Sequence, residues 1–129
     1  MDGHAQVCLL HAEVLKRALG VSGVKTSVCS WQHRADAVYG KGAQIDHLID
    51  RADNVINVCE MKFASGTYLV KKAEFERIDN RIQAFKAVTE TPKSVYLTIV
   101  TTNGLVDNEY ARQAQNVILL DQLFGVVAE

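Results

Sequence analysis

The sequence predicts a single mixed α/β domain that spans residues 1–129. A chain of 129 residues with 48% apolar content has the size of one domain and enough apolar side chains for a buried core. Two segments, 6–19 and 70–89, place apolar residues at helical spacing. The segments that precede and follow 70–89, over 43–63 and 94–102, are rich in β-branched residues, as strands are. No internal repeat, low-complexity stretch or change of composition divides the chain.

A helix, a strand and a loop are expected in the first third of the chain. Apolar side chains three or four residues apart mark one helix face over 6–19, at Val7, Leu10, Val14 and Ala18. Gly20 is placed to end this helix, because glycine readily adopts the left-handed backbone of a helix terminus. The segment 24–31 partly alternates, which predicts a half-buried strand, and a loop over 33–42 is expected to follow.

Strands over 43–51 and 55–63 are expected to form a hairpin. The connection Ala52-Asp53-Asn54 suits a tight turn, because Asp and Asn tolerate the backbone conformations that such turns require. Five apolar residues are expected to place the hairpin in the core: Ile45, Ile49, Ile56, Val58 and Cys59.

A long helix and a central strand are expected in the second half. The helix over 70–89 has one apolar face, formed by Phe75, Ile78, Ile82, Phe85 and Val88. Pro92 follows as a stop, and the nearly continuous β-forming run over 94–102 is typical of a strand covered on both faces. The remaining expected elements are a turn at Asn103-Gly104, a short helix over 107–114, a short strand over 117–120 and a final turn capped by Asp121 that ends at Phe124.

The hairpin is expected to bring two acids together. If the residues that flank the turn face each other, Asp46 lies opposite Glu60 and Gln44 opposite Lys62. Glu60 and Lys62 share a face of their strand, and regular alternation also places on one face Gln44, Asp46, Leu48 and Asp50. Two close carboxylates repel unless a cation lies between them, so Asp46 and Glu60 are the candidate ligands of Mg²⁺, with Mn²⁺ as an alternative. Lys62 can then orient a water or stabilise a phosphate, which predicts phosphodiester hydrolysis.

These residues resemble the signature of the PD-(D/E)XK nucleases, which is an Asp on one strand and Glu-x-Lys on the next. Here it is Gln44-Ile45-Asp46 followed by Glu60-Met61-Lys62. The predicted order αβββαβ, with a short helix and a short final strand, is similar to the restriction-endonuclease-like core of that superfamily. The segments GAQIDHLIDRADNVINVCEMKF, VYLTIVTTNGL and ILLDQLF resemble the C-terminal domain of a family of bacterial AAA-type ATPases. The resemblance implies a nucleic acid partner, most readily DNA, and an attached ATPase domain.

Two features depart from these families. The chain contains no G-x-x-x-x-G-K-[ST] phosphate loop, so the resemblance implies a fragment or a free-standing relative of such an ATPase. Members of the nuclease superfamily often carry an additional acid early on the first helix, where this chain has Ala5, and the only acid on that helix is Glu13. A catalytically inactive module that binds nucleic acid or regulates an attached ATPase is therefore the alternative, and self-association as a homodimer is a third.

Less specific interpretations exist for the same residues. Asp46, Glu60 and Lys62 can form an ordinary cross-strand salt bridge, worth under about 1 kcal/mol on an exposed hairpin, and Asp50 is expected to pair with Arg51 or solvent. Gln44, Lys71 and Lys72 are the candidate nucleic-acid contacts, and other polar or basic residues near them are Tyr68, Arg77 and Arg81. Acids interleave with this group at Glu74, Glu76 and Asp79, which favours a solvated helix face.

Composition narrows the class of protein. A formal net charge of −1 offers no long-range attraction to nucleic acid, so any such contact must come from local patches. The three cysteines, Cys8, Cys29 and Cys59, lack metal-binding or disulfide spacing, which favours a reducing cytoplasm. No apolar run approaches the roughly 18 residues of a membrane span, and neither a signal peptide nor an anchor is expected.

Overall fold

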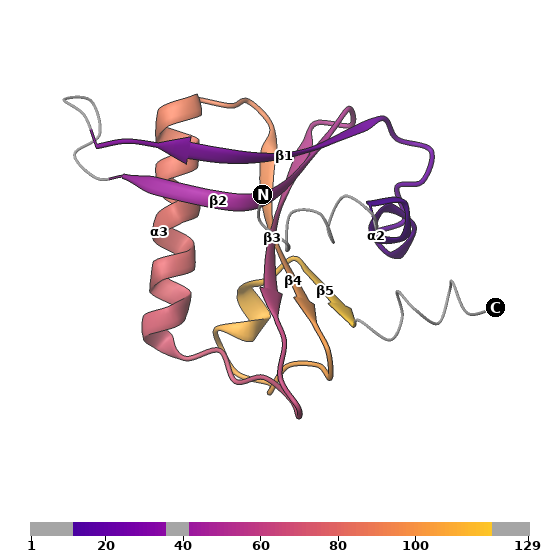
Figure 1. Cartoon of the computed structure of the whole chain (residues 1–129), viewed down its shortest axis with the longest axis vertical. Coiled ribbons are helices and arrows are strands. Elements are labelled where there is room, and N and C mark those ends of the chain that lie inside the picture. The colour runs from indigo at the N-terminus through magenta and orange to yellow at the C-terminus, as the bar shows by residue number, and fades with distance from the viewer. Residues whose placement is uncertain (1–11, 36–41, 120–129) are drawn as a thin grey trace.

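The computed structural model describes residues 12–35 and 42–119, which form a five-stranded sheet with helices packed against it (Figure 1). The strands lie in the sheet in chain order, with β1, β2 and β3 paired antiparallel and β3, β4 and β5 paired parallel. The predicted mixed α/β class is confirmed for this part of the chain. Its elements are α2 (Ala12–Ala18), β1 (Thr26–His33), β2 (Ala43–Arg51), β3 (Val55–Lys62), α3 (Lys72–Thr89), β4 (Ser94–Thr101), the 3₁₀ helix η1 (Ala111–Gln113) and β5 (Asn116–Leu119).

The sheet separates two apolar clusters. On one side, Ile78 and Phe85 of α3 pack with Val58 of β3, so the predicted apolar face of this helix is confirmed. On the other side, Leu15 of α2 packs with Cys59. Figure 1 shows α3 and α2 on opposite sides of the central strands. Neighbouring residues of a strand point to opposite faces, which is why Val58 and Cys59 belong to different clusters.

The turn between β2 and β3 fixes the register of the hairpin. Asn54 adopts a φ of 67°, a left-handed conformation that asparagine tolerates. Leu48 pairs with Val58 and Asp50 with Ile56, which is the predicted register. The expected core residues of the hairpin are all buried: Ile45, Ile49, Ile56, Val58 and Cys59.

The helix α2 ends at the predicted glycine. Gly20 has a φ of 75°, its N–H donates to the carbonyl oxygen of Arg17 at 3.1 Å, and the N–H of Val21 donates to that of Lys16 at 2.8 Å. This pair of bonds is a Schellman motif, which satisfies carbonyls that the last helical turn leaves open. The end of the first helix was therefore predictable from its glycine.

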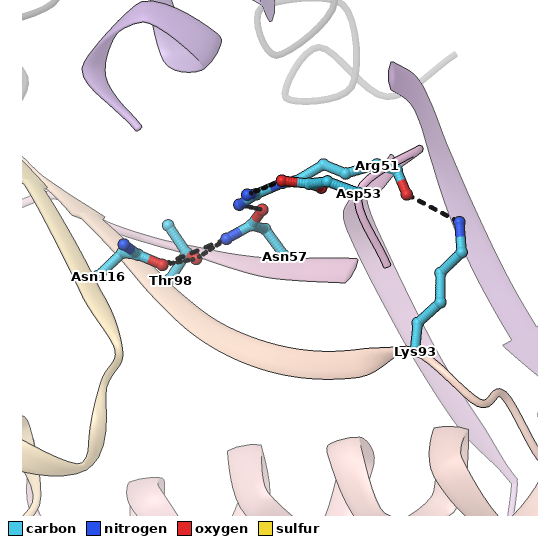
Figure 2. Close-up of polar contacts among 6 residues, drawn as sticks. All are labelled: Arg51, Asp53, Asn57, Lys93, Thr98 and Asn116. Atoms are coloured by element: carbon cyan, nitrogen blue, oxygen red, sulfur yellow. Dashed lines mark hydrogen bonds and ion pairs between the residues drawn. The ribbon is translucent and has the colours of Figure 1, made fainter. Parts of the chain in front are cut away.

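A row of buried polar side chains crosses the sheet on the face that also holds Cys59 (Figure 2). Arg51 Nη1 donates to Asn57 Oδ1 at 3.1 Å, and Asn57 Nδ2 donates to Thr98 Oγ1 at 2.9 Å and to Asn116 Oδ1 at 3.2 Å. Asn57 and Thr98 are fully buried. Because buried polar groups are costly unless they are hydrogen-bonded, this row favours one mutual arrangement of β2, β3, β4 and β5.

The charges at the base of the hairpin differ from the expected pairing. Arg51 binds both carboxylate oxygens of Asp53, at 2.9 and 2.6 Å. Asp50 pairs with Lys93 instead, whose Nζ lies 2.6 Å from Asp50 Oδ1 and 2.8 Å from the carbonyl oxygen of Arg51. The expected pairing of Asp50 with Arg51 is wrong, because the α3–β4 connection brings a lysine 43 positions away in the chain to the hairpin.

Several predicted bounds are also corrected. The first strand is Thr26–His33 rather than 24–31, so strand structure extends into the predicted loop over 33–42. The helix predicted over 107–114 is only the short η1, because the chain turns at once to join β4, where the N–H of Gln115 donates to the carbonyl oxygen of Leu97 at 3.0 Å.

Other predictions fall outside the described residues. These include the first helical turns over 6–11, the residue Ala5, most of the loop over 36–41, and the final turn between Asp121 and Phe124. The predicted extent of one domain over 1–129 includes these segments. Within 12–35 and 42–119, no helix combines the length and the apolar character that crossing a membrane requires.

Candidate functional site

The strand β2 carries a bulge at the predicted metal ligand. Its pairing with β1 shifts register, so that Asp46 and His47 together stand opposite one residue of β1. The extra residue interrupts the alternation of side chains, and Ile45 and Leu48 therefore pack into the same apolar cluster. The expectation that one face of the strand holds Gln44, Asp46, Leu48 and Asp50 is therefore wrong.

Asp46 lies beyond the paired part of the hairpin. The β2–β3 ladder ends at the pair Leu48–Val58, so the predicted direct opposition of Asp46 and Glu60 is not one of its pairs. Asp46 is exposed, and its Oδ1 accepts a hydrogen bond from Gln44 Nε2 at 2.7 Å. Burial is the largest cause of the raised pKa of Glu60, and the negative charge of Asp46 adds a smaller contribution to this rise.

Glu60 is held between β3 and α3. Its side chain is only 17% exposed, and Arg81 Nη2 donates to its Oε1. Burial is the largest influence on the pKa of Glu60 and raises it, while the positive charges of Arg81 and Lys62 oppose the rise without cancelling it. The carboxylate is therefore a desolvated acid with one cationic partner, the type of group that is common in functional sites.

Lys62 has a partner of its own on α3. Its Nζ lies 3.0 Å from Glu74 Oε2, and both side chains are mostly covered. The phenol of Tyr68 donates to the same oxygen at 2.7 Å. Burial acts to raise the pKa of Glu74, but the hydrogen bonds from Tyr68 and Lys62 outweigh it and lower that pKa. The hydrogen bond from Tyr68 to Glu74 is also the largest cause of the raised pKa of Tyr68, which is about 12.

The helix α3 thus supplies site residues that the sequence did not identify as such. The sequence favours a solvated helix face for Glu74 and Arg81, and it names Tyr68 only as a polar residue near the candidate phosphate contacts. Glu74 and Arg81 are seven positions apart, which is about two helical turns, so they lie on nearly the same side of α3. This spacing was a usable signal, but only the packing of α3 on β3 assigns each residue its partner.

The predicted nucleic-acid contacts occupy two separate places. Lys71 and Lys72 are exposed at the start of α3, the turn that also carries Glu74. Lys72 Nζ lies 3.9 Å from Glu76, and its side chain is 72% exposed. Gln44 binds Asp46 and also lines an open depression at the ends of β1 and β2, with Gln32, His33, Arg34, Ala35, Gly42 and Ala43.

The acids fit only one mode of metal binding. Among the residues that the structure describes, no group of three or more His, Cys, Asp or Glu side chains is placed to hold a metal ion. Asp46 and Glu60 offer two carboxylates, and Mg²⁺ is commonly held by one or two carboxylates together with waters and substrate phosphates. The donor set therefore fits a hard divalent cation whose coordination the substrate completes.

No protein-family model, curated protein or solved structure matches this chain. The interpretation of the site consequently rests on its own chemistry. Two interacting carboxylates can bind a cation, and an ammonium held beside them can stabilise negative charge on a bound anion. Anchoring to the sheet and to α3 gives these groups a fixed arrangement.

Proposed function

We propose that this domain hydrolyses phosphodiester bonds of nucleic acid with Mg²⁺ or Mn²⁺, in the manner of the PD-(D/E)XK nucleases. The observation that carries the proposal is the placement of one acid on each of two adjacent strands, Asp46 on β2 and Glu60 on β3, with Lys62 two residues beyond Glu60 on the same face of β3. The order of one helix, three antiparallel strands, a helix and a parallel strand supports a restriction-endonuclease-like core.

In this proposal each side chain has a defined role. Asp46 and Glu60 would hold the cation, which when bound would lower the pKa of a water and offset negative charge on the phosphate. Lys62 donates hydrogen bonds from its ammonium to a phosphate oxygen or to the attacking water. Arg81 neutralises Glu60 in the free protein and must yield part of that interaction when the cation binds.

The substrate surface follows from the same geometry. Gln44 links Asp46 to the open depression at the ends of β1 and β2, which is also lined by Arg34. Lys71 and Lys72 lie at the start of α3 and are exposed. A DNA strand is the proposed substrate because its phosphates suit isolated basic residues around an acidic centre. An attached ATPase domain, which the resemblance implies, and self-association as a homodimer are further proposals.

One observation favours a second function, that of a non-catalytic module that binds nucleic acid or regulates an attached ATPase. Glu60 is already neutralised by Arg81, and Lys62 by Glu74. A site with internal counter-ions can stay folded without a metal, and its basic residues can still contact phosphates. Metal binding decides between the two functions, because only the catalytic one requires it.

Hydrolysis of single- and double-stranded DNA with Mg²⁺ or Mn²⁺ tests the proposal. The wild-type protein is expected to cleave, whereas Asp46→Asn and Lys62→Met are expected to lose at least about 100-fold in rate, since each removes a group placed at the reacting phosphate. Asp107→Asn is the matched control, because Asp107 is an exposed acid that is paired with Arg112.

Calorimetry with each metal completes the test. Heat of binding that disappears in Asp46→Asn and in Glu60→Gln supports the catalytic assignment. DNA binding without cleavage, together with no metal heat attributable to these two acids, supports the non-catalytic module instead.

A further inference from the structure

The ammonium of Lys62 is fixed by α3 and not by the acids of the hairpin. Its Nζ lies 3.0 Å from Glu74 Oε2, while Glu60 pairs with Arg81. Lys62 follows Glu60 along β3, and Glu74 precedes Arg81 along α3, so strand and helix run in opposite directions past each other. Each charged group of β3 therefore has a separate counter-ion, and Lys62 is kept from collapsing onto Glu60.

Glu74 is itself held by a group that the backbone anchors. The phenol of Tyr68 donates to Glu74 Oε2 at 2.7 Å. The N–H of Tyr68 donates to the carbonyl oxygen of Gly104 at 2.9 Å, and its own carbonyl accepts from the N–H of Val106 at 2.9 Å. These bonds tie the loop after β3 to the segment after β4, so the phenol reaches Glu74 from a fixed position.

We infer that Glu74, oriented by Tyr68, is the positioning residue that sets where the Lys62 ammonium points in the proposed hydrolysis. The inference rests on the proposed function. An ammonium has three N–H donors, and its contact with Glu74 directs the others in a defined orientation. A lysine stem has four rotatable bonds, so without such a partner the ammonium samples many positions and spends little time at the phosphate.

Steady-state cleavage of DNA with Mn²⁺ measures the effect on kcat and KM. Glu74→Gln is expected to lower kcat by about 10–100-fold with KM little changed, as loss of a supporting partner typically does. Tyr68→Phe keeps the aromatic ring and is expected to lower kcat in the same direction by less, because Glu74 remains. Asp79→Asn, at an acid of the same helix that accepts a hydrogen bond from Gln83, is the matched control and is expected to keep the wild-type rate.

A second measurement does not depend on activity. Absorbance titration of the tyrosines is expected to show one phenol that ionises at about 12 in the wild-type protein and is missing in Tyr68→Phe. In Glu74→Gln that phenol is expected to ionise nearer its ordinary value of 10, since its carboxylate acceptor is gone. The slow-exchanging ammonium signal of Lys62 in NMR spectra is expected to weaken in the same variant.

The outcomes separate the inference from the proposed function. Wild-type kcat in Glu74→Gln, with activity lost in Lys62→Met, overturns the inference and leaves the proposed function standing. An unchanged phenol titration in Glu74→Gln also overturns the inference. No cleavage of DNA by the wild-type protein with either metal overturns both, because there is then no reaction in which Lys62 is positioned.

Discussion

Glu60 and Glu74 lie between the same strand and helix, yet their surroundings shift their pKa values in opposite directions. Burial raises the pKa of Glu60 despite the opposing positive charges of Arg81 and Lys62. Burial also acts on Glu74, but hydrogen bonds from Tyr68 and Lys62 reverse its effect and lower the pKa. Ionised Glu60 therefore lowers folding stability, as is common for a functional acid, whereas ionised Glu74 raises it.

We predict opposite pH dependences of stability for these two acids. The folded-state pKa of Glu60 lies above its ordinary value of 4.5. Between these two pKa values, the folded protein therefore binds more protons than the unfolded protein. Wild-type protein then loses stability relative to Glu60→Gln as the pH rises from 4.5 through the raised pKa. The folded-state pKa of Glu74 lies below 4.5, so its contribution is complete above that value and is lost as the pH falls through the lowered pKa.

Urea denaturation at a series of pH values between about 3 and about 7 measures both differences. Far-UV circular dichroism at neutral pH controls for folding of the two variants. Slopes of the same sign for Glu60→Gln and Glu74→Gln contradict the assignment of their environments.

Arg81 is predicted to compete with a bound cation for Glu60. Arg81→Gln removes the internal counter-ion and is expected to tighten Mn²⁺ binding by about two- to fivefold, because a partly exposed ion pair is worth at most about 1 kcal/mol. The side chain of Arg81 is 40% exposed, which limits the effect. Isothermal calorimetry measures it, with Lys86→Gln on the last turn of α3 as the charge-matched control. Equal affinities in all three proteins would remove Arg81 from the account of the site.

At the scale of elements, β3 is the strand that links structure and site. Its first half carries Asn57 in the buried polar row (Figure 2), and its second half carries Glu60 and Lys62. It pairs antiparallel with β2 and parallel with β4, so a shift against either neighbour would move both charged groups. Because a one-residue slip turns every side chain to the other face, the polar row protects the position of the site as well as the core.

Replacement of Asn57 is predicted to destabilise the whole sheet. Asn57→Leu leaves Arg51 Nη1 without its buried acceptor and is expected to cost about 2–4 kcal/mol. Thr98 Oγ1 loses the donor on Asn57 but keeps its contact with Asn116 Oδ1 at 3.3 Å. Thr98→Val removes one hydroxyl while Asn57 keeps Asn116, and about 1 kcal/mol is expected. Equilibrium urea denaturation measures both values. A smaller loss for Asn57→Leu than for Thr98→Val would contradict the central place of Asn57 in the row.

At the scale of the whole molecule, charge is nearly balanced, with fourteen basic and fifteen acidic residues. Long-range attraction to DNA is therefore weak, and binding must depend on where the basic residues lie. Lys71 and Lys72 are exposed at one end of α3, on the first turn that also carries Glu74. DNA bound at these two lysines would therefore lie beside the helical turn whose Glu74 pairs with Lys62.

The salt dependence of DNA binding is predicted to reveal these contacts. Lys71→Gln combined with Lys72→Gln is expected to weaken duplex binding and to reduce the slope of log affinity against log salt by about 0.9 for each lost phosphate contact. Lys25→Gln, an exposed lysine just before β1, serves as the control. Fluorescence anisotropy at several salt concentrations measures the slope. An unchanged slope in the double variant would exclude α3 from the interface.

Local patterns made a large part of the fold predictable. Spacing of apolar residues indicated α3, Gly20 indicated the end of α2, and the turn around Asn54 indicated the hairpin register. The bulge at Asp46 was not predictable, because regular alternation is assumed when a strand is identified by its pattern, and only pairing with β1 shows an extra residue. The length of the helix near 111 was missed for a similar reason, since pairing of β5 with β4 limits it.

The sequence by itself determined that acids and a lysine would lie on adjacent strands of one hairpin, since turn chemistry and strand periodicity are local properties. Only the tertiary structure decided which groups neutralise them: Arg81 for Glu60, and Glu74 with Tyr68 for Lys62. Those pairs join residues that are 21, 12 and 6 positions apart and depend on how α3 packs against the sheet. Packing is a sum of many long-range apolar contacts, which no single segment of sequence encodes.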